Sequence, residues 1–162
     1  MIEVAVKDYT AIIDSPLGML GILDNGEVIQ AVNFLYNSAK ARKAESSLAK
    51  QAISQLNQFF LDPSFKFDLP ITDAISPFQM KVRKALLSIP VGQTMSYGNV
   101  ATAVASSARA IAGGCRRNPV PIIVPCHRII AANGLGGFSG ALDGMPLANK
   151  KWLLEHERTA RK

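Results

Sequence analysis

The residues best suited to covalent chemistry stand together in the segment VPCHR, residues 124–128. A cysteine thiolate is a strong nucleophile, and nearby positive charge favours the thiolate over the thiol. His127 and Arg128 directly follow Cys126, and they could supply a base and that positive charge. Neighbouring side chains in extended chain point to opposite faces, so proton transfer from Cys126 to His127 needs a bridging water or a turn at Pro125. Without such a context, a single cysteine is usually a small buried hydrophobic residue.

The second histidine, His156, lies near the end of the sequence between two acids, Glu155 and Glu157. An imidazole that acts as a base needs a carboxylate to orient it through its other ring nitrogen. Either acid could take that role from a helix over residues 147–158. Taken alone, each acid is equally consistent with a solvated helix face.

The spacing of cysteines, histidines and glycines argues against metal or cofactor chemistry. Cys115, Cys126, His127 and His156 lack the close ligand pairs of zinc sites, so we expect no metal and no disulfide. The glycine-rich loop 134–140 fails the dinucleotide fingerprint, because Ser139 occupies the position of the last glycine. The loop could let a ligand approach the backbone closely, or it could simply connect two elements. We expect no cofactor.

The elements that must position these residues indicate an α+β fold. The first half predicts strands over residues 4–13, 19–23 and 28–35, with a hairpin at Asn25-Gly26 and a helix over 39–60 that Pro63 ends. A further strand or extended connector covers 65–69. Later residues predict helices over 77–87, 97–105, 108–115 and 147–158, and extended chain through the proline-rich run before Cys126.

Charge divides the chain near residue 73. Residues 1–73 carry six basic and nine acidic side chains, whereas residues 74–162 carry twelve basic and three acidic ones. We therefore expect a small N-terminal α/β domain (1–73) with antiparallel strands and one helix. It precedes a mostly helical domain (74–162) whose short helices 97–105 and 108–115 form a basic helix-turn-helix.

Composition excludes several classes of protein. The 162 residues are 48% hydrophobic and 19% charged, which suits a globular core. The opening residues lack the basic and apolar runs of a signal peptide, and the longest uncharged stretch, 85–108, is too polar to span a membrane. We expect a monomer that is neither secreted nor in a membrane, and is cytoplasmic, or nuclear in a eukaryote.

The order of motifs from residue 89 to residue 157 resembles one enzyme family. IPVGQTMSYG is followed by ARAIAGG, NPVPIIVPCHRII, GGFSG and KKWLLEHE. This series resembles the O6-alkylguanine-DNA alkyltransferases, also called methylated-DNA–protein-cysteine methyltransferases. The first half matches that family only in kind, as its small α/β domain.

The resemblance implies DNA repair by direct, one-turnover transfer of an alkyl group from O6 of guanine to Cys126. His127 would remove the thiol proton through a water, and Glu157 would polarise His127. Asn118 would tie the turn before the cysteine to the active site. Tyr97 would donate to the leaving guanine and rotate the 3′ phosphate. The thioether product has no hydrolytic exit, so each molecule would act once.

The resemblance also implies double-stranded DNA as the partner, bound through the minor groove. Because O6 is inaccessible in the base stack, the base must flip into the protein, and Arg109 would fill the gap. The DNA-contacting residues would be Tyr97, Ala108, Arg109, Ala110, Gly113, Gly114, Arg116 and Arg128. The base pocket would comprise Tyr97, Val124, Cys126, Phe138, Ser139 and Gly140.

The chain departs from the family pattern at Phe138, at Cys115 and at an insertion over residues 143–146. Three other readings use part of the same pattern: a non-catalytic binder of alkyl damage, a helix-turn-helix regulator, and a cysteine hydrolase built on Cys126, His127 and Glu157. Only alkyl transfer uses the thiol, the base, the acid and the basic helix together. The range of alkyl groups, and activity on O4-alkylthymine, stay open at this point.

Overall fold

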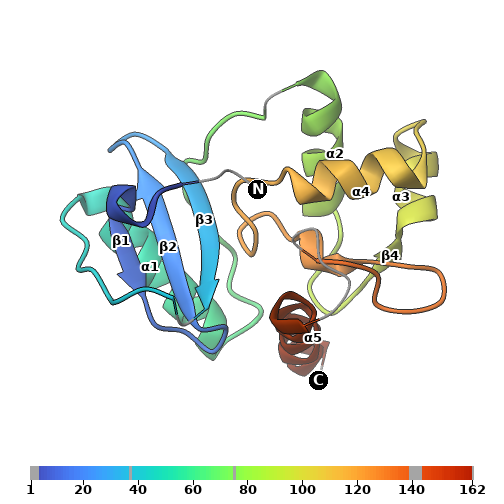
Figure 1. Ribbon diagram of the computed structural model, residues 1–162. Coiled ribbons are helices and arrows are strands. Elements are labelled where there is room, and N and C mark those ends of the chain that lie inside the picture. The colour runs from blue at the N-terminus through green and yellow to red at the C-terminus, as the bar shows by residue number, and fades with distance from the viewer. Residues whose placement is uncertain (1–3, 37, 75, 139–143, 162) are drawn as a thin grey trace. The chain divides into compact units, whose positions relative to one another are not determined.

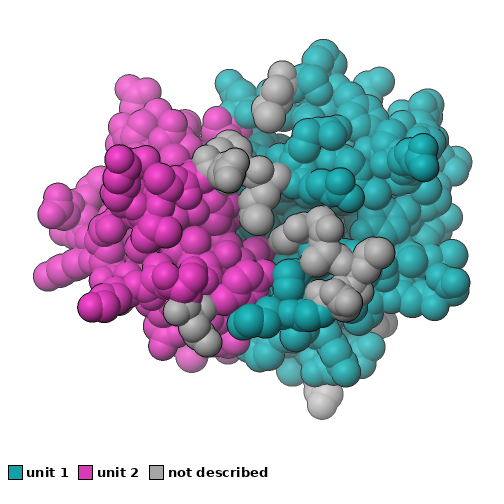
Figure 2. Space-filling model, in the orientation of Figure 1, with its two compact units in different colours: residues 1, 73–162 teal, residues 2–72 magenta. Residues whose placement is uncertain are grey.

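The computed structural model describes residues 4–36, 38–74, 76–138 and 144–161. The chain forms two compact units, residues 2–72 and residues 73–162 (Figure 2). Figure 1 shows a sheet with one helix in the first unit and mostly helices in the second. The expected α+β class is confirmed. No helix among the described residues has the length and apolarity needed to cross a bilayer.

The first unit is a three-stranded antiparallel sheet covered by one helix. Strands β1 (Ala11–Ile13), β2 (Met19–Asp24) and β3 (Ile29–Tyr36) pair in that order, with Ala11 opposite Ile22 and Ile22 opposite Val32. Helix α1 (Ser47–Leu61) packs against β2 and β3 through buried Leu48, Ala52, Leu56 and Phe59. The apolar stripe and the turn residues in the sequence therefore predict the helix and the hairpin of this unit correctly.

Three boundaries in the first unit differ from the expected ones. Residues 6–8 form a short 3₁₀ helix, η1 (Val6–Asp8), whose backbone carbonyls accept from the Arg42 guanidinium rather than from a strand. Helix α1 begins after Ser46, which caps it by accepting from the Ala49 amide at 3.0 Å. Residues 65–69 form no strand, and pairing resumes only at Ile71. Residues that favour strands cannot form one without a neighbouring strand to pair with.

The described residues of the second unit form four α-helices, and three of them start at a local capping signal. Helices α2 (Pro77–Leu87), α3 (Tyr97–Ala103) and α4 (Ala108–Arg116) are each capped by a serine, and α5 (Gly144–Arg158) closes the chain before η3 (Thr159–Arg161). The two-residue strands β4 (Met95–Ser96) and β5 (Ile129–Ile130) pair in parallel. This pairing brings the start of α3 beside the segment that follows Cys126.

Helices α3 and α4 pack against each other across a tight turn, as the helix-turn-helix prediction requires. Helix α3 ends at Ala103, two residues earlier than expected, because Ala105 adopts a left-handed conformation (φ 55°). The Ser106 amide donates to the Ala101 carbonyl at 2.8 Å, and Ser107 then caps α4. The turn therefore presents the first residues of α4 at the surface.

Helix α4 also packs closely on α2 through its glycine-rich side. Ile111 and Gly114 are buried, and a Cβ atom on Gly114 would lie 3.0 Å from a methyl group of Val82. Helix α5 buries one face of its own, formed by Asn149, Lys150, Leu153 and Glu157. The contact between α2 and α4 and the buried face of α5 both adjoin the segment that carries the cysteine.

Candidate active site

Cys126 lies in a turn rather than in extended chain, which corrects the expectation for this segment. It begins the 3₁₀ helix η2 (Cys126–Arg128), and its amide donates to the Val124 carbonyl at 2.8 Å. Pro125, at φ −81° and ψ 66°, forms the inverse γ-turn between them. The side chain of Cys126 is buried, with 7% of the residue exposed. Proline excludes helix at this position but permits a tight turn as readily as a strand.

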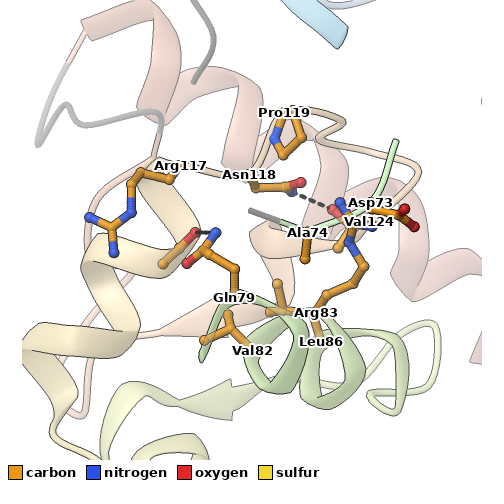
Figure 3. Close-up of a pocket in the computed structure, with 11 residues that line it drawn as sticks. Asp73, Ala74, Gln79, Val82, Arg83, Leu86, Arg117, Asn118, Pro119 and Val124 are labelled. Atoms are coloured by element: carbon orange, nitrogen blue, oxygen red, sulfur yellow. Dashed lines mark hydrogen bonds between the residues drawn. The ribbon is translucent and has the colours of Figure 1, made fainter. Parts of the chain in front are cut away.

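Asn118 holds the loop that leads to this turn. Its Nδ2 donates to the Val124 carbonyl at 3.0 Å (Figure 3). Its Oδ1 accepts from the Val120 amide at 3.1 Å. The loop also places Ile122 at a φ of 73°, a strained conformation for a β-branched residue. Since Val124 also accepts from Cys126, Asn118 sets the position of the cysteine turn.

A cavity of about 20 Å³ lies beside this loop, lined by residues of α2, the end of α4 and the loop itself (Figure 3). This volume admits about one water and no base. Gln79 extends toward it from α2, and its Nε2 donates to the Gly114 carbonyl at 3.3 Å. Its Oε1 is buried and has no hydrogen-bond partner among the described residues. The residues that line the cavity therefore support the loop, and the cavity is too small to be a substrate pocket.

His127, Glu157 and Arg128 form a buried cluster beside Cys126. His127 Nε2 lies 3.0 Å from Glu157 Oε2. Arg128 donates to both Glu157 oxygens, at 2.9 and 2.7 Å, and to the Ile89 carbonyl at 2.7 Å. His127 is fully buried, and its Nδ1 has no hydrogen-bond partner within the described part of the chain. The cluster leaves one imidazole nitrogen open for a further proton donor.

The electrostatics of the cluster define its protonation. Burial alone would raise the pKa of Glu157, but hydrogen bonds from His127 and Arg128 lower it to about 2. Burial lowers the pKa of His127, and Glu157 only partly opposes this effect. At neutral pH Glu157 is therefore an anion and His127 a neutral base. Burial raises the pKa of the Cys126 thiol, while a hydrogen bond from Asn118 and the charge of Lys150 lower it.

Tyr97 stands at the start of α3, and its hydroxyl donates to the Gly137 carbonyl at 3.5 Å. Burial and the two nearby thiols raise the pKa of Tyr97 to about 12, so the phenol keeps its proton at neutral pH. Phe138 is buried and Val124 is almost fully buried. The other two expected pocket residues, Ser139 and Gly140, lie outside the described residues.

The residues expected to contact DNA divide into two groups. Ala108, Arg109 and Arg116 are exposed on α4, and Ala110 and Gly113 are partly exposed. Gly114 instead faces α2 inside the unit, and Arg128 is held inside by Glu157 and Ile89. The structure thus shows Gly114 packed against α2 and Arg128 bound to Glu157 and Ile89, and the DNA contacts of the whole set stay predictions.

Lys150 is the site residue that the sequence did not single out. Its side chain is fully buried, and its Nζ donates to the carbonyls of Ile129 and Gly137 at 2.5 and 3.0 Å. A signal was present in the spacing of α5, where Lys150, Leu153 and Glu157 share one helical face. The pair Lys150-Lys151 suggests an exposed position unless that spacing is taken into account. The described residues contain no group of three or more potential ligands arranged to hold a metal ion.

Comparisons with known proteins place these features in a single family. The model for the 6-O-methylguanine DNA methyltransferase DNA-binding domain matches residues 77–159. The methylated-DNA–protein-cysteine methyltransferase of Mycobacterium tuberculosis is 35% identical over 154 residues, which cover 91% of this chain and 90% of the relative. The same-named protein of Methanosarcina acetivorans is 35% identical over 143 residues, or 83% of this chain and 92% of the relative.

Solved structures agree with the sequence comparison. The crystal structure of the M. tuberculosis O6-methylguanine methyltransferase superposes with a TM-score of 0.77 at 34% identity, covering 92% of both chains. The M. tuberculosis OGT in complex with DNA gives a TM-score of 0.77 at 35% identity, with the same coverage.

Proposed function

The chain belongs to the family of O6-methylguanine DNA methyltransferases, and we propose that it repairs DNA by moving the alkyl group of O6-alkylguanine onto its own Cys126. One observation carries this proposal. A buried thiol sits beside a neutral histidine that touches an ionised glutamate and keeps Nδ1 free. This is the arrangement of a cysteine nucleophile with an oriented general base.

The chemistry follows from these side chains. A water between Cys126 and His127 passes the thiol proton to Nδ1, and Glu157 stabilises the imidazolium that forms. The sulfur attacks the alkyl carbon, so that the S–C bond forms as the C–O6 bond breaks. The guanine leaves with the electron pair of that bond. It takes a proton from the Tyr97 hydroxyl, whose raised pKa keeps it a donor.

The product explains why one molecule should act once. An S-alkylcysteine is a thioether, and neither His127 nor Glu157 offers a route that returns the thiol. The protein is therefore both the enzyme and the acceptor. A cysteine hydrolase would instead form an acyl or similar intermediate that water can cleave.

DNA is the partner, and base extrusion is part of the proposal. Cys126 and His127 are too deeply buried to reach an O6 atom within stacked DNA, so the alkylated base must leave the helix. The exposed first turn of α4 carries Arg109 next to alanines small enough to approach a narrow minor groove. All these residues lie in one compact unit of one chain, so a monomer suffices.

Intact mass after incubation with duplex DNA that contains O6-methylguanine tests this function. We expect the wild-type chain to gain the mass of one CH₂ group, which peptide mapping places on Cys126. Cys126→Ala should gain nothing and still bind the duplex, because the basic surface is unchanged.

Cys115→Ala is the matched control, since it removes the other thiol and should leave the gain intact. A methyl group found on Cys115 would refute the assigned nucleophile. Repeated release of repaired DNA without any mass change would favour the hydrolase, and binding without transfer would favour the damage-binding reading.

A further inference from the structure

Gln79 carries a buried acceptor that the fold leaves without a donor. It stands in the first turn of α2, where its amide donates to the capping hydroxyl of Ser76 at 3.1 Å. Only 9% of the residue is exposed, and its Nε2 donates to the Gly114 carbonyl at 3.3 Å. Its Oε1 has no hydrogen-bond partner among the described residues. Because a buried oxygen without a donor destabilises the folded state, a donor is expected beside it.

The orientation of the Gln79 amide is set by its surroundings. Gly114 offers a carbonyl oxygen, which can only accept, so the side chain must present its NH₂ group there. Exchanging the two ends of the amide would place two acceptors against each other. Helix α4 leaves room for the side chain because residue 114 is glycine, since a Cβ atom there would lie 3.0 Å from Oε1. The unpaired oxygen therefore follows from the packing of α2 on α4.

The cavity beside Gln79 has the size of one water molecule (Figure 3). Its volume of about 20 Å³ is enough for a single water and for nothing larger. Four other polar side chains share its wall: Asp73, Arg83, Arg117 and Asn118. A buried water makes about three hydrogen bonds to groups of this kind. The cavity therefore combines the right volume with an acceptor that needs a donor and with further polar partners.

We propose that this cavity binds one structural water, which donates a hydrogen bond to Gln79 Oε1 and bridges α2 to the loop that carries Asn118. Gln79 is then a positioning residue for alkyl transfer, because Asn118 holds the cysteine turn through the Val124 carbonyl. The inference rests on the proposed role of Cys126 as nucleophile. It gives the loop before the cysteine an anchor on α2 in addition to the hydrogen bonds that Asn118 makes.

The path from Gln79 to the sulfur consists of a few hydrogen bonds. Gln79 binds the Gly114 carbonyl in the last turn of α4, the helix that leads into the loop. Asn118 Nδ2 donates to the Val124 carbonyl, which also accepts from the Cys126 amide at 2.8 Å. A small displacement of the loop would therefore move the nucleophile, and reaction rates depend steeply on the position of the reacting atoms.

A high-resolution crystal structure of the resting protein tests the site directly. We expect one electron-density peak in the cavity, about 2.5 to 3.0 Å from Gln79 Oε1 and within hydrogen-bond distance of a second polar atom of the wall. Gln79→Met keeps the length of the side chain without its amide, and the peak should be absent in that variant. A dry cavity in the wild-type crystal would overturn the proposal.

The pH dependence of Cys126 labelling tests the positioning role. Iodoacetamide reacts when the thiolate attacks its carbon, so that an S–C bond forms and iodide leaves, and the rate against pH reports the thiol–thiolate equilibrium. A hydrogen bond from Asn118 lowers the pKa of the Cys126 thiol, and this bond depends on the position of the loop. We would measure labelling by peptide mapping in a Cys115→Ala background.

We expect Gln79→Met to raise the midpoint of the profile by about half a pH unit and to slow labelling at neutral pH about threefold. Ile111→Val is the control for packing, because Ile111 is fully buried in α4 and is no part of the cavity wall. It should lower the melting temperature and leave the midpoint unchanged. An unchanged midpoint in Gln79→Met, or an equal shift in Ile111→Val, would overturn the positioning role.

Neither the crystal nor the labelling experiment needs DNA, so this inference and the proposed function can fail separately. A chain that holds the water and shows the Gln79-dependent midpoint, but takes no methyl group from DNA, would refute the proposed function alone. Methyl transfer to Cys126 in a chain whose cavity is dry would refute this inference alone.

Discussion

At the scale of single residues, Glu157 decides the state of the whole cluster. Arg128 donates two hydrogen bonds to it, and His127 Nε2 lies 3.0 Å from its Oε2. Arg128 keeps the carboxylate ionised. Burial leaves His127 neutral although Glu157 opposes this effect, and its Nε2 faces the carboxylate. The open nitrogen is then the basic one. Arg128 thus contacts the other members of the cluster through Glu157.

Replacing Glu157 by Gln should slow methyl transfer by about 10²-fold, since an imidazole without an orienting carboxylate is a poorer base. Single-turnover rates on duplex DNA containing O6-methylguanine measure this. Glu155→Gln, two residues earlier and exposed, should keep the wild-type rate. An unchanged rate for Glu157→Gln would remove this acid from the mechanism.

The same substitution should alter acid stability. In the folded protein the pKa of Glu157 is about 2, against 4.5 for a free side chain. The unfolded chain therefore binds more protons between these values, and the stabilisation is present above about pH 4.5 and lost as the pH falls toward 2. Burial lowers the pKa of His127 in the folded protein, and this adds a further loss of stability that begins as the pH falls below 6.5.

Denaturant unfolding at successive pH values should show a shallower acid limb in Glu157→Gln than in wild type. Glu155→Gln should retain the wild-type slope. Parallel limbs for wild type and Glu157→Gln would show that the carboxylate carries no such linkage.

The sequence predicted which residues lie together better than it predicted their surroundings. Motif order brought Cys126, His127 and Glu157 together, although nothing in their separation along the chain required it. Lys150 was not predicted, because two adjacent lysines give no sign in the sequence that one of them is buried. The pairing of Arg128 with Glu157 was not predicted, because charge alone does not tell an interior ion pair from a surface contact. Both outcomes depend on partners distant in sequence.

At the scale of elements, the close approach of α4 to α2 depends on one glycine. A Cβ atom on Gly114 would lie 3.0 Å from Val82 and from Gln79 Oε1. Gly114→Ala should therefore lower the melting temperature, despite the better helix propensity of alanine. Gly113→Ala is the matched control, because its Cβ would meet only the flexible end of Arg117 at 3.3 Å.

Thermal unfolding of the two variants separates packing from propensity. Gly113→Ala should be neutral or stabilising by up to about 1 kcal/mol. If both variants were equally stable, the contact between α2 and α4 would have to yield more easily than its geometry indicates.

The first turn of α4 should matter for duplex DNA and not for the free base. Arg109→Ala removes the exposed side chain proposed to replace the extruded nucleotide, so transfer from duplex DNA should fall about tenfold or more. Reaction with free O6-alkylguanine should stay unchanged. Lys84→Ala, which removes one exposed charge from α2, controls for net charge, and an equal loss on both substrates would refute the role of Arg109.

Elements were predicted well where the signal is local. Serines at 76, 96 and 107 mark three helix starts because a side-chain cap acts within three residues. The turn at Cys126 was only one of the alternatives left open, since prolines exclude helix without choosing between strand and turn. Residues 4–10 favour strand, but only a partner strand could have made them one.

At the scale of the whole molecule, charge is divided unequally. Twelve of the eighteen basic residues and only three of the twelve acids follow residue 73, and the proposed chemistry lies in that part as well. Binding that neutralises phosphates should weaken steeply as salt rises. The unequal charge could be counted from the sequence, because the count does not depend on which residues are in contact.

Helix α5 fixes the spacing between two residues of the site. Lys150 and Glu157 share its buried face seven residues apart, two turns and about 10.5 Å along the axis. One residue inserted between them would rotate one against the other by about 100°, and would take one of the two side chains off the buried face. Distant proteins with the same chemistry should therefore be sought by this seven-residue interval.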